Sequence, residues 1–179
     1  LKMLEESLII YKLMTTEETP TFNGTYYQID GAINQPKPIQ KPYPPLWVCG
    51  GGEKVTLKLL AKYGDYGNWD VDVEGFIHKS NILKEHCKNE NRDFNDIGRT
   101  LHTNVLIADT KSNLDKKIDK LAEYTNIPKD YYYERPLIGT KDEVFNIIKE
   151  YENVGCSYLI AYVPDIVWGD TLNILCELN

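Results

Sequence analysis

Residues 44–53 have the sequence PPLWVCGGGE, and the segment after them, residues 54–63, has a helical pattern. Four consecutive apolar residues after two prolines predict a short strand buried on both faces. The three glycines then predict a turn without side chains just before the helix begins. Backbone N–H groups at such a turn are unobstructed, and the helix dipole adds roughly half a positive charge. We therefore expect a turn that can bind a phosphate or a carboxylate.

The glycine run has a second interpretation, because glycines after a buried strand can simply permit a sharp turn and close helix packing. The run also differs from two well-known phosphate-binding motifs. It lacks the Gly-Lys-Ser/Thr ending of a P-loop, and it lacks the Gly-x-Gly-x-x-Gly pattern of a dinucleotide site. From the residues alone, both the anion-binding turn and the structural turn remain open for Gly50, Gly51 and Gly52.

The composition narrows the class of protein. The chain has 179 residues, of which 42% are hydrophobic, and this is enough for one hydrophobic core. A net charge of −7 argues against binding to nucleic acid or to anionic membranes, since both require a concentrated Lys/Arg surface. No apolar run approaches the ~20 residues of a membrane span, and no signal peptide opens the chain. We expect a cytoplasmic protein.

The cysteines and two groups of polar residues indicate structural roles. Cys49, Cys87, Cys156 and Cys176 are far apart and lack zinc-site spacing, so reduced thiols and no metal site are predicted. The acidic residues at positions 70, 72 and 74 come at the start of a predicted helix, where carboxylates usually complement the helix dipole and only less often bind a ligand. His102 lies in an apolar strand pattern, and such a residue is more often a core residue than a base.

Periodicity and turn signals predict an alternation of strands and helices after an opening helix and a hairpin. The first half of the chain is expected to contain a helix over residues 1–14, a tight hairpin turn at Asn23-Gly24, a proline-rich extended segment over 36–45, a helix over 54–63, a strand over 66–69 and a helix over 73–89. A strand over 101–108 and a helix over 114–122 follow, and then a polar and aromatic insertion over 126–136. The last expected elements are a helix opened by a Thr140/Glu143 capping box and ended by Gly155, a buried strand over 158–163 and a helix over 171–178.

Four strand–helix units in succession predict an α/β fold with a parallel sheet and right-handed crossovers. Such units fit either a small open sheet or half of an eight-unit barrel. The chain starts at Leu1 inside a helical pattern, with neither a Met nor a capping residue before it. We take this as favouring the half barrel.

In order and spacing, these segments resemble the luciferase-like monooxygenase superfamily, within its flavin- or deazaflavin-dependent oxidoreductases. The resemblance is to the C-terminal half of these proteins and runs nearly from end to end of the chain. It is carried by residues 4–10, 21–27, 36–42, 45–53, 64–69, 86–87, 92–93, 139–144 and 155–160.

The resemblance implies that residues 1–179 are a single partial domain, the C-terminal half of a TIM (β/α)8 barrel. Residues 15–45 then form a hairpin and proline-rich insertion, and residues 124–139 form an insertion loop. A flavin or deazaflavin, FMN or coenzyme F420, would lie across the carboxyl ends of the strands. The implied cofactor-binding residues are Cys49, Gly50, Gly51 and Gly52 at the phosphate, with Asn68 and Trp69 on the cofactor or substrate side.

The implied function is that of an oxidoreductase, either a monooxygenase or a hydride-transferring reductase or dehydrogenase, which acts on a small organic substrate. The family places the residues around the reactive ring in its first four strands, so no catalytic residue is assigned here. Tyr131, Tyr132 and Tyr133 are expected to form a lid or to line the substrate pocket, unless they pack on the outside of the barrel.

Two other classes remain open. The chain could be a non-catalytic half-barrel that acts as a binding or subunit module, or an unrelated phosphate-binding barrel. A half barrel leaves two unpaired sheet edges, and such edges tend to pair with another chain. We therefore expect a homo-oligomer.

Overall fold

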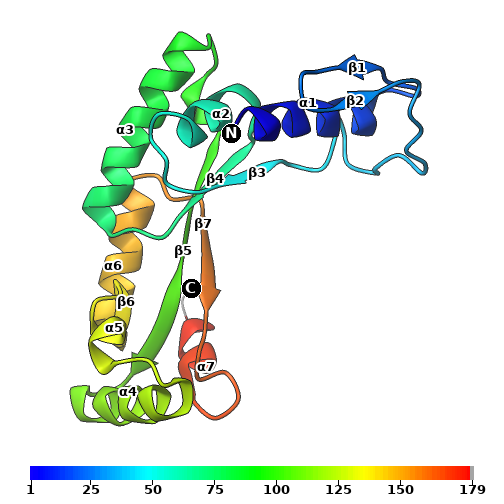
Figure 1. Ribbon diagram of the computed structural model, residues 1–179. Helices are drawn as coiled ribbons and strands as arrows, with labels where there is room; N and C mark the ends of the chain where they lie inside the picture. Colours follow the sequence, from blue (N-terminus) through cyan, green and yellow to red (C-terminus); the bar gives the residue numbers. More distant parts are fainter. Residues whose placement is uncertain (178–179) are drawn as a thin grey trace. The chain divides into compact units, whose positions relative to one another are not determined.

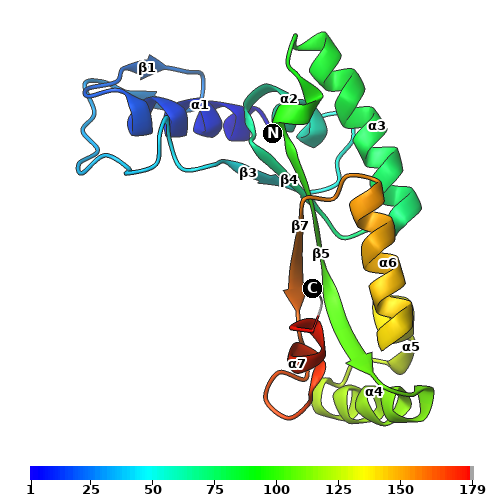
Figure 2. The same cartoon turned by 180° about the vertical axis from the view of Figure 1, so that it is seen from behind.

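The computed structural model describes residues 1–177, which form an α/β fold of two compact units (Figures 1 and 2). Unit 1 contains Leu1–Gly67 and Ile82–Ile97. Unit 2 contains Asn68–Asn81 and the described residues from Gly98 onward. That the whole chain is a single partial domain stays a prediction.

Most helices and the longer strands lie where the sequence predicts them, whereas the elements at residues 94–96, 129–133 and 137–140 were not predicted. The elements of unit 1 are α1 (Lys2–Thr16), β1 (Phe22–Asn23), β2 (Gln28–Ile29), β3 (Trp47–Cys49), α2 (Thr56–Tyr63) and the 3-10 helix η1 (Phe94–Asp96). In unit 2 they are β5 (Gly98–Ala108), α4 (Lys111–Thr125), α5 (Lys129–Tyr133), β6 (Leu137–Thr140), α6 (Lys141–Asn153), β7 (Tyr158–Tyr162) and α7 (Thr171–Leu175). Strand β4 (Tyr66–Trp69) and helix α3 (Val73–Asn89) each contribute residues to both units.

The hairpin of unit 1 differs from the predicted tight turn. Its two strands pair Phe22 with Ile29 and Asn23 with Gln28, so a longer turn over residues 24–27 joins them. The carboxylate of Glu6 accepts hydrogen bonds from the three backbone N–H groups of residues 25–27, at 2.8 to 2.9 Å. Gly24 is required by this close approach, because a Cβ atom there would lie 2.4 Å from Glu6 Oε2. Gly24 is not among the residues with a positive φ, so the backbone conformation does not explain why glycine is needed there.

The proline-rich segment over 36–45 is irregular, as expected, and two contacts hold it to α1. Tyr11 Oη donates a hydrogen bond to the carbonyl oxygen of Pro44 at 2.9 Å. Lys37 Nζ donates to the carbonyl oxygen of Met14 at 3.0 Å. The segment is thus a tethered connection that leads into β3.

Strand β3 is not buried on both faces, contrary to the prediction. Val48 is buried, whereas Trp47 and Cys49 are exposed. The ring of Trp47 stacks on Tyr66 of β4, with ring centroids 4.5 Å apart and an interplanar angle of 15°. A run of apolar residues shows that a strand is present, but it does not show which of its faces another element covers.

Unit 2 is organised around the long strand β5, which pairs in parallel with two others. Residues 105–108 pair with β6, in the register Val105↔Leu137 to Ala108↔Thr140. Residues 100–104 pair with β7, in the register Thr100↔Tyr158 to Asn104↔Tyr162 (Figures 1 and 2). Helix α5 lies within residues 124–139 and strand β6 begins there, so that segment is not the loop expected from the sequence.

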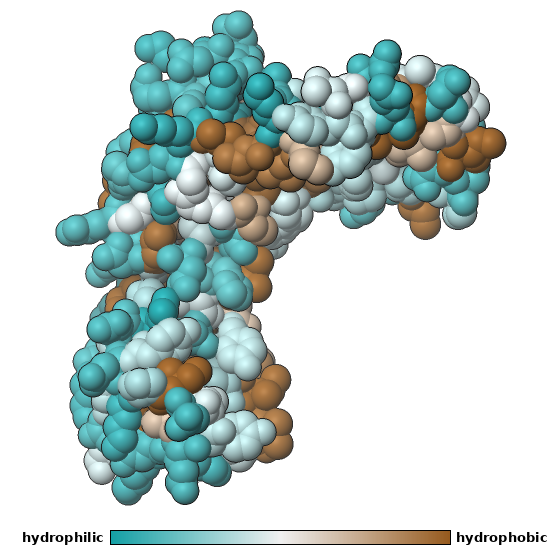
Figure 3. Space-filling model, in the orientation of Figure 1, coloured by the Kyte–Doolittle hydropathy of each residue, from teal (hydrophilic) through white to brown (hydrophobic). Residues whose placement is uncertain are grey.

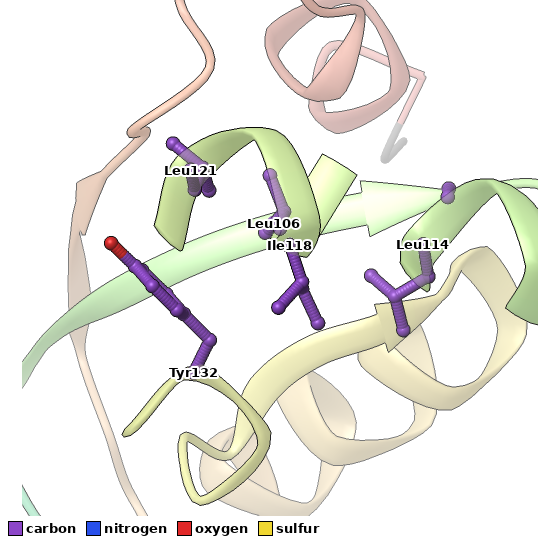
Figure 4. Packing of buried hydrophobic residues seen from close by; sticks show 6 residues of the cluster. Leu106, Leu114, Ile118, Leu121 and Tyr132 are labelled. Carbon is purple, nitrogen blue, oxygen red and sulfur yellow. The ribbon is translucent and has the colours of Figure 1, made fainter. Parts of the chain in front are cut away.

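Residues 105–108, at the carboxyl end of β5, are covered on both faces of the sheet. Leu106 and Ala108 pack with three residues of α4 and with Tyr132 of α5 (Figure 4). The α4 residues of this cluster are Leu114, Ile118 and Leu121. Val105 and Ile107 alternate with Leu106 and point to the other face, where they are also fully buried.

Helix α6 begins and ends as the sequence predicts. Thr140 and Glu143 form a capping box at its start. Gly155, just beyond its last residue, has a φ of +88°, a conformation in which glycine is favoured. The final helix, predicted over 171–178, is observed as α7, and Leu178 lies outside the described residues.

Strand β7 is exposed, although its apolar run predicts a buried strand. Tyr158, Ile160 and Tyr162 keep 54%, 39% and 62% of their surface exposed. The loop between β7 and α7 also carries exposed apolar side chains, Ile166 and Val167. Figure 3 shows hydrophobic surface near the foot of the view. Within residues 1–177, no helix has both the length and the apolar character needed to cross a membrane.

Candidate functional site

The glycine turn of unit 1 joins β3 to α2, and Gly50, Gly51 and Gly52 are all exposed. Gly50 has a φ of +115°, which side-chain-bearing residues rarely adopt. At Gly52 a Cβ atom would lie 2.8 Å from the hydroxyl oxygen of Thr56, the first residue of α2. Two of the three glycines are therefore required by the backbone or by close packing, as both interpretations of the run allow.

Neighbouring groups hold this turn in place. The N–H group of Leu57 donates a hydrogen bond to the carbonyl oxygen of Gly52 at 3.0 Å. A ring nitrogen of His86 lies 2.8 Å from the carbonyl oxygen of Glu53. Cys49, at the end of β3, has a free and exposed thiol. The turn thus presents exposed backbone before a helix N-terminus, the arrangement that anions bind.

In unit 2, Asn68 and Trp69 are adjacent on β4 and point to opposite faces. The side-chain oxygen of Asn68 accepts a hydrogen bond from Thr100 Oγ1 at 3.0 Å. Trp69 is only 2% exposed, and its ring packs edge-on against Phe76 with centroids 5.1 Å apart. The structure therefore does not bring these two predicted site residues together, and the cofactor role of each stays a prediction.

Asn68 shares its face of the sheet with alternate residues of β5 and β7. On β5 these are Thr100, His102 and Asn104, and the register places Tyr158, Ile160 and Tyr162 beside them. We call this set of residues, with Asn68, the open face. The open face runs along the whole of β7 and the first half of β5, two strands that pair in parallel.

His102 and Asn104 are functional candidates that the sequence interpretation missed. His102 was expected in the core, but it is exposed. The signal that could have identified it is the alternation of polar residues at 100, 102 and 104, which places all three on one face of a strand. Of the three, His102 is exposed, Asn104 is half-buried and Thr100 is buried, whereas Leu101 and Thr103 on the opposite face are both buried.

The three consecutive tyrosines of α5 have three different environments. Tyr132 is 2% exposed within the core cluster, and its hydroxyl lies 2.8 Å from Thr125 Oγ1. Tyr133 is exposed and donates a hydrogen bond to Asp115 at 2.6 Å, which raises the pKa of the Tyr133 phenol to about 12. Tyr131 is half-buried, and its hydroxyl accepts a hydrogen bond from Asn104 at 3.4 Å. Only Tyr131 contacts the open face through a hydrogen bond that the structure defines.

The acidic residues at the start of α3 have the structural contacts expected of them. Asp72 accepts a hydrogen bond from the N–H group of Gly75 at 2.8 Å. Asp70 forms an ion pair with Arg135 at 3.0 Å, and the guanidinium of Arg135 lies over the ring of Tyr131, 4.3 Å from its centroid. Asp70 and Arg135 also line a cleft of about 540 Å³ in unit 2.

Parallel strands with covering helices and a glycine turn between a strand and a helix define a (β/α) domain, a class that binds ligands at the carboxyl ends of its strands. Comparison with known families agrees with this class. The model of the luciferase-like monooxygenase family matches residues 1–134, and the chain belongs to that family.

The chain spans a little over half the length of the solved structures described below. An F420-dependent secondary alcohol dehydrogenase in complex with an F420–acetone adduct is 16% identical, with a TM-score of 0.74, and the match covers 90% of this chain and 56% of that one. A coenzyme F420-dependent tetrahydromethanopterin reductase from Methanopyrus kandleri is 15% identical, with a TM-score of 0.69. The match covers 96% of this chain and 59% of that one.

A riboflavin lyase, RcaE, solved with modified FMN and riboflavin, is 12% identical, with a TM-score of 0.73. The match covers 98% of this chain and 55% of that one. These likenesses show the fold, an α/β arrangement that corresponds to about half of the TIM barrel of these enzymes.

Proposed function

We propose that the protein acts as the C-terminal part of an oxidoreductase that uses FMN or coenzyme F420 on a small organic substrate. The observation that carries this proposal is the family match over residues 1–134, which includes the glycine turn and β4. Two of the structural neighbours are described as F420-dependent, and another was solved with modified FMN. Either cofactor has a phosphate for the glycine turn to bind.

The glycine turn has the properties that a cofactor phosphate requires. Its residues are exposed, it lies just before α2, and Gly52 has no room for a Cβ atom beside Thr56. We assign the phosphate to the backbone of Gly50, Gly51 and Gly52, with Cys49 at the edge of the site. The helix dipole of α2 would add favourable charge at this position.

The bound cofactor would supply the redox chemistry: a flavin exchanges one or two electrons and reacts with oxygen, whereas the deazaflavin transfers hydride. The residues of this chain bind and orient. In this proposal Asn68, held by Thr100, presents a fixed amide at the end of β4. Trp69 supports that strand end from the α3 side through its contact with Phe76. Tyr131 and Tyr133 of α5 are the lid residues, and Tyr132 anchors them to the core.

The first test is native mass spectrometry of the protein purified from its source, which reads chain mass and retained cofactor together. A retained flavin or deazaflavin would support the proposal and would identify the chemistry. A chain that carries neither, even after incubation with FMN and with F420, would contradict it.

The second test addresses the phosphate site. We expect Gly51→Val to weaken FMN or F420 binding at least tenfold, measured by cofactor fluorescence, because a branched side chain would block the approach of the phosphate. Gly31→Asn is the control, since Gly31 lies outside the turn with nothing within 4 Å of a Cβ atom, and asparagine tolerates its φ of +55°. Unchanged affinity in Gly51→Val would remove the glycine turn from the cofactor site.

A non-catalytic binding module is not favoured, because the family and the structural neighbours consist of oxidoreductases. The same fluorescence titration separates the two functions. A binding module of another class would have no affinity for either cofactor.

A further inference from the structure

The open face of unit 2 combines hydrogen-bonding groups with aromatic rings and has no formal charge of its own. Its hydrogen-bonding side chains with exposed surface are Asn68, His102 and Asn104, and Thr100, which is buried, donates a hydrogen bond to Asn68. Its exposed apolar and aromatic side chains are Tyr158, Ile160 and Tyr162. None of these residues is an acid, a lysine or an arginine. Such a surface suits a molecule that is apolar over most of its area and has one or two polar atoms.

The side chains around His102 are held in place by contacts of their own. Asn68 is bonded to Thr100 at 3.0 Å, and Asn104 is bonded to Tyr131 at 3.4 Å. His102 lies between Thr100 and Asn104 on the same face of β5, and its ring is exposed. It can offer an N–H donor from either ring nitrogen.

The register places Ile160 directly beside His102, with Tyr158 and Tyr162 on either side of Ile160 along β7. Aromatic and aliphatic side chains on the strand next to a hydrogen-bond donor provide an apolar surface on which the ring of a ligand can lie. Arg135 lies over the ring of Tyr131, 4.3 Å from its centroid, and its charge is paired with that of Asp70 at 3.0 Å.

We infer that His102 is a substrate-binding residue, which donates a hydrogen bond to the carbonyl or hydroxyl oxygen of an uncharged, ring-bearing organic substrate lying on Tyr158, Ile160 and Tyr162. This inference rests on the proposed function and extends it, because it names the class of substrate that the proposed enzyme would bind. An organic anion is disfavoured, because the open face has no cation to replace the water that a carboxylate loses on binding.

The test compares two probes of the same shape, acetophenone and benzoate. The chain contains three histidines, so their imidazole proton resonances can be resolved, and His102→Gln identifies the signal of residue 102. We expect acetophenone at millimolar concentration to shift the His102 signal in a saturable way. The signals of His78 and His86, which lie on α3, should not move.

We expect benzoate to bind at least tenfold more weakly than acetophenone, and His102→Leu to weaken acetophenone binding about five- to tenfold. His102→Gln keeps a donor and should retain most of the affinity. A His102 signal that acetophenone leaves unmoved, or benzoate affinity equal to that of acetophenone, would overturn the inference.

This outcome is separable from the failure of the proposed function. Cofactor fluorescence with FMN and F420 is measured on the same sample and reports cofactor binding at the glycine turn of unit 1. If acetophenone binds at His102 and neither cofactor binds, the ligand class of the open face is upheld and the oxidoreductase assignment fails. If a cofactor binds and His102 does not respond, the oxidoreductase assignment is upheld and the inference is overturned.

Discussion

Lys117 of α4 and Asp165 of the loop after β7 form an ion pair of 2.8 Å whose carboxylate is entirely buried. Their side chains are 13% and 0% exposed. Asp165 also accepts a hydrogen bond from Thr171 at 2.8 Å, and Lys117 donates to the carbonyl oxygen of Ile107 at 2.6 Å. Lys117 also pairs with Asp170 at 2.5 Å. These contacts connect β5, α4 and the start of α7, and removing Lys117 would leave the buried carboxylate of Asp165 without its cation.

The first prediction concerns this pair. Lys117→Met should lower the free energy of unfolding by roughly 3–5 kcal/mol, because it leaves a buried carboxylate without its cation. Urea denaturation followed by circular dichroism measures the change. The double variant Lys117→Met/Asp165→Asn should recover part of the loss, since the uncompensated charge is gone.

Lys129→Met is the matched control, because Lys129 pairs with Asp119 on the surface with both side chains about half exposed. An exposed pair contributes only about 0–1 kcal/mol. Equal losses in Lys117→Met and Lys129→Met would show that burial does not govern the strength of the Lys117–Asp165 pair.

The second prediction concerns pH. Lys111, followed by the backbone and hydroxyl of Thr140, lowers the pKa of Glu143 from its usual 4.5 to about 2. A lowered carboxyl pKa stabilises the folded state above pH 4.5, and this contribution is lost as the pH falls toward 2. The melting temperature of Glu143→Ala should therefore lie below that of the wild type at pH 6 and converge on it near pH 2. A constant difference over this range would contradict the assigned role.

The order of elements could be read from the sequence because each helix carries its own signals. The capping box at Thr140 and Glu143 and the left-handed Gly155 are local features, and both are present as predicted. The β-hairpin was located correctly, but its turn was not. The reason is that Glu6, from a distant part of the chain, binds the turn amides, and no local pattern reports such a contact.

Burial could be predicted less well than secondary structure. The apolar run at β7 and the apolar context of His102 both suggested burial, yet these residues are exposed. Side-chain composition indicates that a strand forms, whereas exposure depends on which element covers each face. For the same reason Trp69 could not be assigned to a face, since its packing on Phe76 depends on the placement of α3.

The third prediction separates the three tyrosines of α5. Tyr132→Ala should destabilise the protein by roughly 3–5 kcal/mol, because it removes a ring from the core cluster with Leu106 and Leu121. Tyr133→Ala should change stability by less than about 1 kcal/mol, since Tyr133 is exposed. If Tyr131 and Tyr133 form the lid, Tyr131→Ala and Tyr133→Ala will change substrate KM or kcat in the assembled enzyme. Unchanged kinetics would leave α5 with a structural role only.

The fourth prediction is self-association. The loop after β7 carries two exposed apolar residues, Ile166 and Val167, which are costly to leave in water. We expect the chain to sediment as a dimer or a larger species at micromolar concentration. Ile166→Lys with Val167→Lys should shift the distribution toward the monomer, because buried charges oppose association. A wild-type chain that sediments only as a monomer would exclude association through these residues.

The fifth prediction concerns the packing of Gly52 against Thr56. In Gly52→Ala the new Cβ atom would lie 2.8 Å from Thr56 Oγ1, so the turn must shift, and we expect cofactor binding to weaken by about 1 kcal/mol, or roughly fivefold. Adding Thr56→Ala removes the hydroxyl, and the next closest atom of residue 56, its Cβ, is 3.5 Å away, an ordinary contact. The double variant Gly52→Ala/Thr56→Ala should therefore regain the affinity of Thr56→Ala alone, measured by the same fluorescence titration. If it does not, Gly52 is needed for the approach of the cofactor itself and not for the packing of α2, and that result would select the anion-binding interpretation of the glycine run over the purely structural one.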